Sequence, residues 1–250
     1  MKQFFALYVK ELKANKILFL FLLLLIVGLN AYGLIHIENL ELETKTILNA
    51  LWSVLAVFTL VLSLPFLLAH AFNTEWKSET HYQMFALPVP QYIVNLAKVA
   101  AVASKGIVGS AIVTIGLSLW AARGAALMNV HMLRVGETEV TAFFDFAFLV
   151  GLTLVTYMIF ILGLVTGMEG VKFAVKRYRG LTAVVFFVIA VFVYGRLFQQ
   201  GAKALDFFGQ ISMTPPSEFT IDLAPFVYTI LMGVIFMIIG LVVYEKRAEI

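Results

Sequence analysis

Two lysines inside an apolar stretch are the residues of this sequence that could do chemistry within a membrane. Lys98 and Lys105 stand seven residues apart in the apolar segment 93–121, so a helix would place both on one face, roughly 10 Å apart along its axis. They could line a polar cavity and meet an anionic substrate. Alternatively, the true span begins near Gly106 and both side chains extend along the helix to reach water. We favour this second interpretation.

The sequence offers little for other chemistry. Its histidines are dispersed over different connections or span ends, which argues against a metal site: His36, His70, His81 and His131. There is no cysteine, and the phosphate-binding G-x-x-x-x-G-K-[ST] loop and the H-E-x-x-H and G-x-S-x-G motifs are absent. Asp145 and Glu169 lie at opposite ends of one apolar segment, where we expect both to face water. We therefore expect no catalytic residue, metal or cofactor in this chain.

Composition places the elements that carry these residues in a bilayer. Of the 250 residues, 62% are hydrophobic and 13% are charged, and the mean hydropathy is +0.96. Soluble domains carry about 25% charged residues, so this chain cannot cover a surface that faces water. The net charge of +3 is small. We attribute it to membrane topology and expect no nucleic-acid partner.

Six segments are long and apolar enough to span, which predicts an all-α membrane protein with a single transmembrane domain, 1–250. They run approximately over 17–34, 46–71, 93–121, 143–168, 181–197 and 225–244. Pro65 predicts a kink in the second segment, and Pro225 suits the first turn of the sixth. Gly163 and Gly167, and Gly106 with Ser110, form small-x-x-x-small pairs that let helices approach closely.

Residues 1–16 predict an amphipathic helix. Phe5, Tyr8, Val9 and Leu12 recur at helical spacing, and the lysines lie mostly elsewhere on the wheel. Such a helix can lie in the membrane interface, which we favour, or it can simply lead into the first span.

The connections carry an unequal number of lysines and arginines, which predicts their orientation. Eleven lie on one side: Lys2, Lys10, Lys13, Lys16, Lys77, Lys172, Lys176, Arg177, Arg179, Lys246 and Arg247. Five lie on the other: Lys45, Arg123, Arg134, Arg196 and Lys203. Both termini and the connections 72–92 and 169–180 are therefore expected in the cytoplasm, and the chain in the plasma membrane.

The outer connection 198–224 is too apolar for a plain solvated loop and too short for two more spans. It contains Phe207 and Phe208 and then the pair Pro215–Pro216. We expect a short re-entrant or interfacial hairpin with the prolines at its turn. An extracellular lid is the alternative.

The polar stretch between the second and third spans predicts a further helix, over 74–87. Asn73 or Thr74 could cap it, and Pro88 would stop it. One face carries a half-apolar stripe at helical spacing: Trp76, Thr80, Met84 and Leu87. Such a helix could lie on the membrane or dock into a groove on a partner.

This stretch resembles the ABC-2 family of ATP-binding-cassette transporter permeases. The residues in register with the family pattern are Phe72, Glu75, Thr80, Met84, Phe85, Pro88, Val89 and Lys98. Three departures are Glu79 in place of glycine, Pro90-Gln91 in place of Ser-Arg, and Ala97 in place of the glycine before the lysine. The wider resemblance covers the whole chain: an N-terminal amphipathic helix, six spans, an apolar hairpin before the last span and a basic tail.

The resemblance implies a permease subunit powered by a separate ATPase. Residues 74–87 would then be the coupling helix on which the ATPase docks, with ATP and magnesium bound in that partner. Two ATPase copies and a second permease chain, identical or paralogous, would complete the transporter. The substrate would be an exported amphipathic or hydrophobic molecule such as a peptide, drug or lipid. The alternatives are an intramembrane enzyme acting on lipid or peptide, and a membrane scaffold that transports nothing.

Overall fold

The computed structural model describes residues 2–36, 42–77, 89–127, 137–175, 177–213 and 219–247. Helices carry most of this part of the chain, with one short hairpin of strands. The elements are α1 (Lys2–Ala14), α2 (Lys16–His36), α3 (Leu42–Lys77), α5 (Gln91–Leu127), α6 (Glu137–Phe173), α7 (Arg179–Ala204), the 3-10 helix η2 (Asp206–Phe208), β1 (Gln210–Met213), β2 (Phe219–Asp222) and α8 (Ala224–Arg247).

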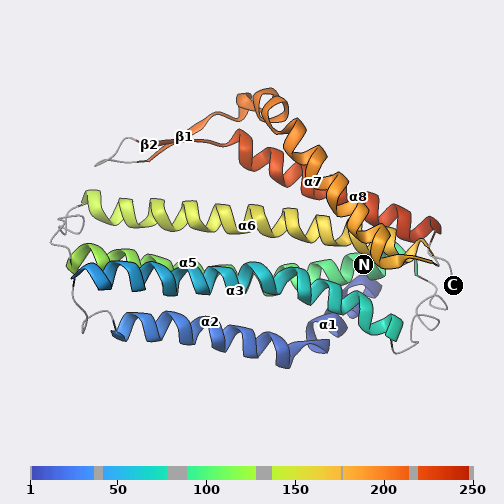
Figure 1. Ribbon diagram of the computed structural model, residues 1–250, viewed down its shortest axis with the longest axis horizontal. Coiled ribbons are helices and arrows are strands. Elements are labelled where there is room, and N and C mark those ends of the chain that lie inside the picture. The colour runs from blue at the N-terminus through green and yellow to red at the C-terminus, as the bar shows by residue number, and fades with distance from the viewer. Residues whose placement is uncertain are drawn as a thin grey trace.

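The long helices form an elongated bundle (Figure 1). Helices α2, α3, α5 and α6 run side by side along the long axis, and α7 and α8 cross it obliquely over one side of α6. Both chain termini lie toward the same end of the bundle, which we call the terminal end. An even number of spans requires this arrangement.

Six of the helices in the described part of the chain are long and apolar enough to cross a membrane. They are α2, α3, α5, α6, α7 and α8, which confirms the six predicted spans. Each helix extends beyond the range predicted for it; α5, for example, begins at Gln91 and ends at Leu127. Pro225 falls in the first turn of α8, as predicted. The chain is a multi-pass membrane protein.

Three helices are much longer than a bilayer requires. Helix α3 has 36 residues, and α5 and α6 have 37 each, which corresponds to roughly 55 Å at 1.5 Å per residue, against about 30 Å of hydrocarbon. Their apolar windows are Val54–Thr74, Gln91–Trp120 and Ala147–Phe173. Most residues outside these windows, 42–53, 121–127 and 137–146, lie at the end of the bundle opposite the terminal end (Figure 1), whereas residues 75–77 of α3 lie at the terminal end.

The core lies where α3, α5 and α6 meet. Leu68 of α3 is fully buried, and Val102 of α5 and Leu162 of α6 pack in the same cluster. A second cluster joins α6, α7 and α8 around Leu164, Tyr228 and other large side chains. The burial of these two clusters of side chains fixes how each span is rotated relative to its neighbours.

Glycines let α6 and α8 approach to backbone contact. A Cβ on Gly163 would collide with the carbonyl oxygen of Gly233, and one on Gly170 would collide with that of Gly240. The predicted Gly163–Gly167 pair therefore does mark a close helix contact, but its partners on α8 are glycines that the four-residue pattern did not single out. Close approach of this kind strengthens dispersion contacts, the main attraction between helices in lipid.

Pro65 lies inside α3, which continues as one helix on both sides of it. Proline has no N–H to donate to the carbonyl four residues earlier, here that of Val61. The hydroxyl of Tyr157 in α6 donates a hydrogen bond to this carbonyl over 3.4 Å. A side chain from a neighbouring helix thus satisfies the group that the proline leaves open.

The connection 198–224 forms a hairpin, whose predicted re-entrant or interfacial placement stays a prediction. Helix α7 continues to Ala204, η2 follows, and β1 and β2 then pair antiparallel, with Ile211 opposite Ile221. The segment is a hairpin, but one made of strands. Pro215 and Pro216, expected at its turn, lie outside the described residues, in the stretch between the two strands.

Candidate functional site

At the terminal end, α1 is fastened to α5 by buried charged groups. The side chains of Lys98 and Lys105 are 1% and 5% exposed, and Glu11 of α1 is 8% exposed. The Nζ of Lys98 lies 3.7 Å from Oε1 of Glu11, and the Nζ of Lys105 donates to the carbonyl oxygen of Glu11 over 3.4 Å. A hydrogen bond of 2.8 Å between the hydroxyls of Tyr8 and Ser104 adds to this contact.

This arrangement corrects the interpretation that we favoured for the two lysines. Their side chains do not extend to water, since both are buried. They contact Glu11 of α1, a helix of the same chain. Sequence reasoning missed Glu11 because it belongs to another helix 87 positions before Lys98. Helix α1 itself is confirmed, over Lys2–Ala14, and one side of it packs on α5 while Phe5 is 65% exposed.

A second polar cluster ties α3 to α6. The Nζ of Lys172 donates to Oδ1 of Asn73 over 2.6 Å and to Oε2 of Glu169 over 2.9 Å. Glu169 is only 7% exposed, so the expectation that it faces water is wrong. Lys172 compensates its charge from one turn further along the same helix. The i, i+3 spacing of a glutamate and a lysine was the sequence signal for this pair.

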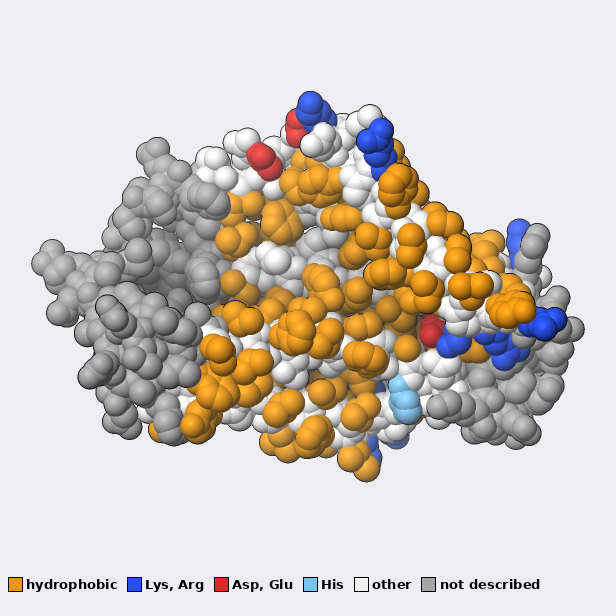
Figure 2. All heavy atoms as spheres, viewed as in Figure 1, with side chains coloured by type: hydrophobic (Ala, Val, Ile, Leu, Met, Phe, Trp, Pro, Cys, Tyr) orange, Lys and Arg blue, Asp and Glu red, His pale blue; other side chains and the backbone are white. Residues whose placement is uncertain are grey.

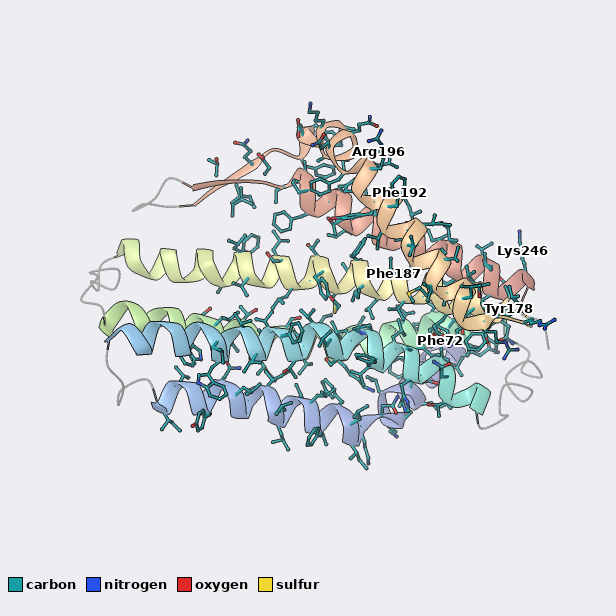
Figure 3. All side chains as sticks on the ribbon, in the orientation of Figure 1. Phe72, Tyr178, Phe187, Phe192, Arg196 and Lys246 are labelled. Carbon is teal, nitrogen blue, oxygen red and sulfur yellow. The ribbon has the colours of Figure 1, made fainter. Side chains whose placement is uncertain are left out.

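Aromatic rings connect the two polar clusters. Phe72 of α3 is 2% exposed and lies 6.4 Å, centroid to centroid, from Tyr244 of α8, which is 6.0 Å from Phe173 of α6. The Nζ of Lys98 lies 6.0 Å from the centre of the Phe72 ring. Phe72 is labelled at the terminal end of the bundle in Figure 3. We call this set the terminal-end network; it comprises Glu11, Phe72, Asn73, Lys98, Glu169, Lys172, Phe173 and Tyr244.

The network lies where α3 leaves its apolar window. Asn73 and Thr74 do not cap a new helix as predicted, because α3 continues unbroken to Lys77. Their side chains donate instead to carbonyls four residues earlier in the same helix, those of Ala69 and His70. Glu75 and Trp76 thus belong to the last turn of α3. The remaining residues proposed for partner binding lie outside the described residues: Thr80, Met84, Leu87 and Pro88.

The opposite end of α7 carries the other predicted site residues. Phe207 is 77% exposed and Phe208 is 47% exposed, and their rings lie 4.5 Å apart between centroids. They form an apolar ledge at η2, next to the hairpin. The structure therefore keeps these residues far from Lys98 and Lys105, and the two sets do not form one site (Figure 1).

The terminal-end network holds helices together through paired charges. Among the residues that the structure describes, no group of three or more His, Cys, Asp or Glu side chains could hold a metal ion. Its two buried carboxylates, Glu11 and Glu169, each lie beside a lysine. Such pairs fix the relative position of helices, because separating them would leave a charge in a medium of low dielectric constant. Comparison with protein-family models, curated proteins and solved structures finds no match to this chain.

Proposed function

We propose that this chain is the permease subunit of an ATP-driven transporter of the ABC-2 type. It would export an amphipathic or hydrophobic substrate, such as a peptide, a drug or a lipid. One observation carries the proposal: α3 leaves the apolar part of the bundle as an unbroken helix and is bound to α6 at that point by Asn73 and Lys172. A helix held in this way can transmit force from residues beyond the span to residues within it.

The contacts of the terminal-end network support this role. Movement of the end of α3 would pass to α6 through the hydrogen bond between Asn73 and Lys172. It would pass to α8 through the rings of Phe72 and Tyr244, and toward α5 through Lys98. Packed helices respond to such movement as rigid bodies, with small shifts at their interfaces.

The proposal assigns ATP and magnesium to separate subunits. One ATPase chain would dock from the cytoplasm on residues 74–87 of each of two permease chains. Trp76 would be the largest anchor, and Glu75 would pair with a basic group. A second permease chain would complete the pathway across the plasma membrane. An intramembrane enzyme receives less support, because the buried carboxylates Glu11 and Glu169 are both engaged with lysines.

The test is the variant Trp76→Ala, with the ATPase that co-purifies with the wild-type chain as the partner. A tryptophan anchor at an interface contributes about 2 kcal/mol or more, so the variant should bind the ATPase with roughly thirtyfold lower affinity. Less ATPase should therefore be recovered in a pull-down. The rate of ATP hydrolysis by the partner should no longer depend on the presence of the transported substrate. The wild type should form a complex of two permeases and two ATPases, which a mass measurement detects.

Phe207→Ala is the matched control, because it removes an exposed aromatic ring beyond the end of α7 that lies away from the terminal end. It should leave ATPase recovery unchanged. Equal recovery of the ATPase by wild type and Trp76→Ala, or a stable lone monomer that still transports, would contradict the proposal.

A further inference from the structure

A lateral groove of about 560 Å³ lies between α2 and α3. Its walls are apolar: Leu18 and Leu22 come from α2, and Leu62, Phe66 and Leu67 come from α3. The polar atoms available in it belong to three side chains, Thr59, Ser63 and His70. The hydroxyls of Thr59 and Ser63 donate to carbonyls of their own helix. The interior of the groove is therefore suited to hydrocarbon.

The length of the groove along α3 matches the thickness of one leaflet. It extends along α3 from Thr59 to His70, eleven residues or roughly 16 Å of helix, which is about half of the 30 Å hydrocarbon core. Both walls belong to apolar windows that span the membrane, Lys16–Ile35 and Val54–Thr74. The groove consequently opens toward lipid tails, and its His70 end lies nearest the terminal end of the bundle.

Basic side chains are available near that end. His70 is exposed there, and Lys13 and Lys16 are exposed at the junction of α1 and α2, next to Leu18 in the chain. The carboxylate of Glu11 is buried against Lys98. Figure 2 shows the same pattern on the visible face, where apolar side chains cover the middle of the bundle and lysines and arginines gather at the terminal end.

We propose that this groove binds an acyl chain of an anionic glycerophospholipid from the leaflet at the terminal end. The chain would lie along Leu22, Leu62 and Phe66, and the phosphate would meet the His70 imidazole and the Lys16 ammonium. Each basic side chain near a bilayer surface favours anionic lipid. A second copy of this chain fits less well, because a two-fold axis along the groove would bring Lys16 of each copy close to Lys16 of its partner. The proposal stands independently of any role in transport.

The absence of cysteine makes a direct test possible. A fluorophore on Leu62→Cys reports lipid in the groove. Ile107→Cys is the matched control, since it is 55% exposed on α5. A Cβ built on nearby Gly106 would lie 3.0 Å from the Leu64 side chain, and one on Gly109 would lie 2.5 Å from that of Leu60, so Ile107 lies at similar depth to Leu62. Each protein is reconstituted into phosphatidylcholine vesicles with spin-labelled phosphatidylglycerol or spin-labelled phosphatidylcholine at equal mole fraction.

We expect phosphatidylglycerol to quench the groove fluorophore about fivefold more strongly than phosphatidylcholine, and both lipids to quench at Ile107→Cys equally. His70→Ala and Lys16→Ala should together remove the preference while leaving quenching by phosphatidylcholine. Both residues are exposed, so these variants should fold. Equal quenching by the two lipids at Leu62→Cys would overturn the proposal. So would weak quenching by both together with cross-linking of Leu62→Cys between two copies, which would mean that another chain covers the groove.

Discussion

Charged side chains inside the bundle are engaged with partners on other helices or within one turn. Lys98 and Lys105 both contact Glu11, and Lys172 contacts Glu169 and Asn73. Ionisable groups at membrane depth are costly, so they persist where a partner compensates them. The apolar context of the lysines was visible in the sequence. Their partners were not, because contact between residues 11 and 98 depends on how α1 folds against α5.

The contribution of the hydrogen bond from Tyr157 to the Val61 carbonyl can be tested by removing one hydroxyl group. Tyr157→Phe should lower the free energy of unfolding by about 1 kcal/mol, because it leaves a partly buried carbonyl without a donor. The measurement is thermal unfolding of the purified protein in mild detergent.

Pro65→Ala supplies the control, since alanine restores the N–H that can bond to the Val61 carbonyl. In that background Tyr157→Phe should cost much less, and the two changes should show a clear coupling energy. An undiminished cost in the Pro65→Ala background would mean that the hydroxyl acts through some other contact.

The N-terminal helix is attached mainly through Glu11, and its attachment can be measured separately from global stability. Ser104→Cys places a thiol under α1, at the position that contacts Tyr8. Glu11→Ala should speed its labelling by a maleimide, because Lys98 loses the carboxylate that holds α1, although the hydrogen bond from Lys105 to the backbone carbonyl of residue 11 can persist. Removal of one member of a buried ion pair commonly costs about 3–5 kcal/mol, so the effect should be large.

Two further variants show whether charge is the cause. Lys10→Ala removes an exposed lysine 3.9 Å from the same carboxylate, and it should leave the labelling rate unchanged because exposed pairs contribute little. Adding Lys98→Met to Glu11→Ala removes the buried charge and should slow labelling again. If Lys10→Ala acts as strongly as Glu11→Ala, burial of the pair is not what holds α1.

Contact between α6 and α8 leads to another prediction. Gly233→Leu should lower the free energy of unfolding by about 1–3 kcal/mol or more, since a Cβ there would lie 2.7 Å from the Cα of Phe160. Gly195→Leu on α7 is the control, because no atom lies within 4 Å of its Cβ position. The measurement is again thermal unfolding in detergent, and similar losses in both variants would contradict the glycine contact.

The existence of the elements was predictable, whereas their ends and contacts were less so. Apolar runs identified all six spans, because the hydrocarbon core imposes a minimum length. The same runs could not show that α3 continues to Lys77, since polar residues such as Asn73 and Thr74 are also typical of a cap. The apolar residues of 198–224 were taken for a membrane-inserted hairpin, but alternation in β1 and β2 supports strands equally well. Gly233 and Gly240 could be paired with α6 only from the packed structure.

At the scale of the whole molecule, the two ends of the bundle differ in kind. The terminal end holds both chain termini, the terminal-end network and the end of α3. The opposite end holds the ends of α3, α5 and α6 that residues 42–53, 121–127 and 137–146 form.

The orientation of these ends is testable in intact cells. Eleven lysines and arginines on the terminal-end side against five on the other predict that the terminal end is cytoplasmic. Val175→Cys and Phe207→Cys place one thiol beyond each end of the span α7, at positions 36% and 77% exposed. A membrane-impermeant maleimide should label Phe207→Cys in intact cells and Val175→Cys only after the cells are opened. Detergent-solubilised protein should be labelled at both positions, which controls for reactivity. Labelling of Val175→Cys in intact cells, with Phe207→Cys protected, would invert the topology. It would also place the end of α3 and residues 74–87 outside the cell, where no ATPase could dock.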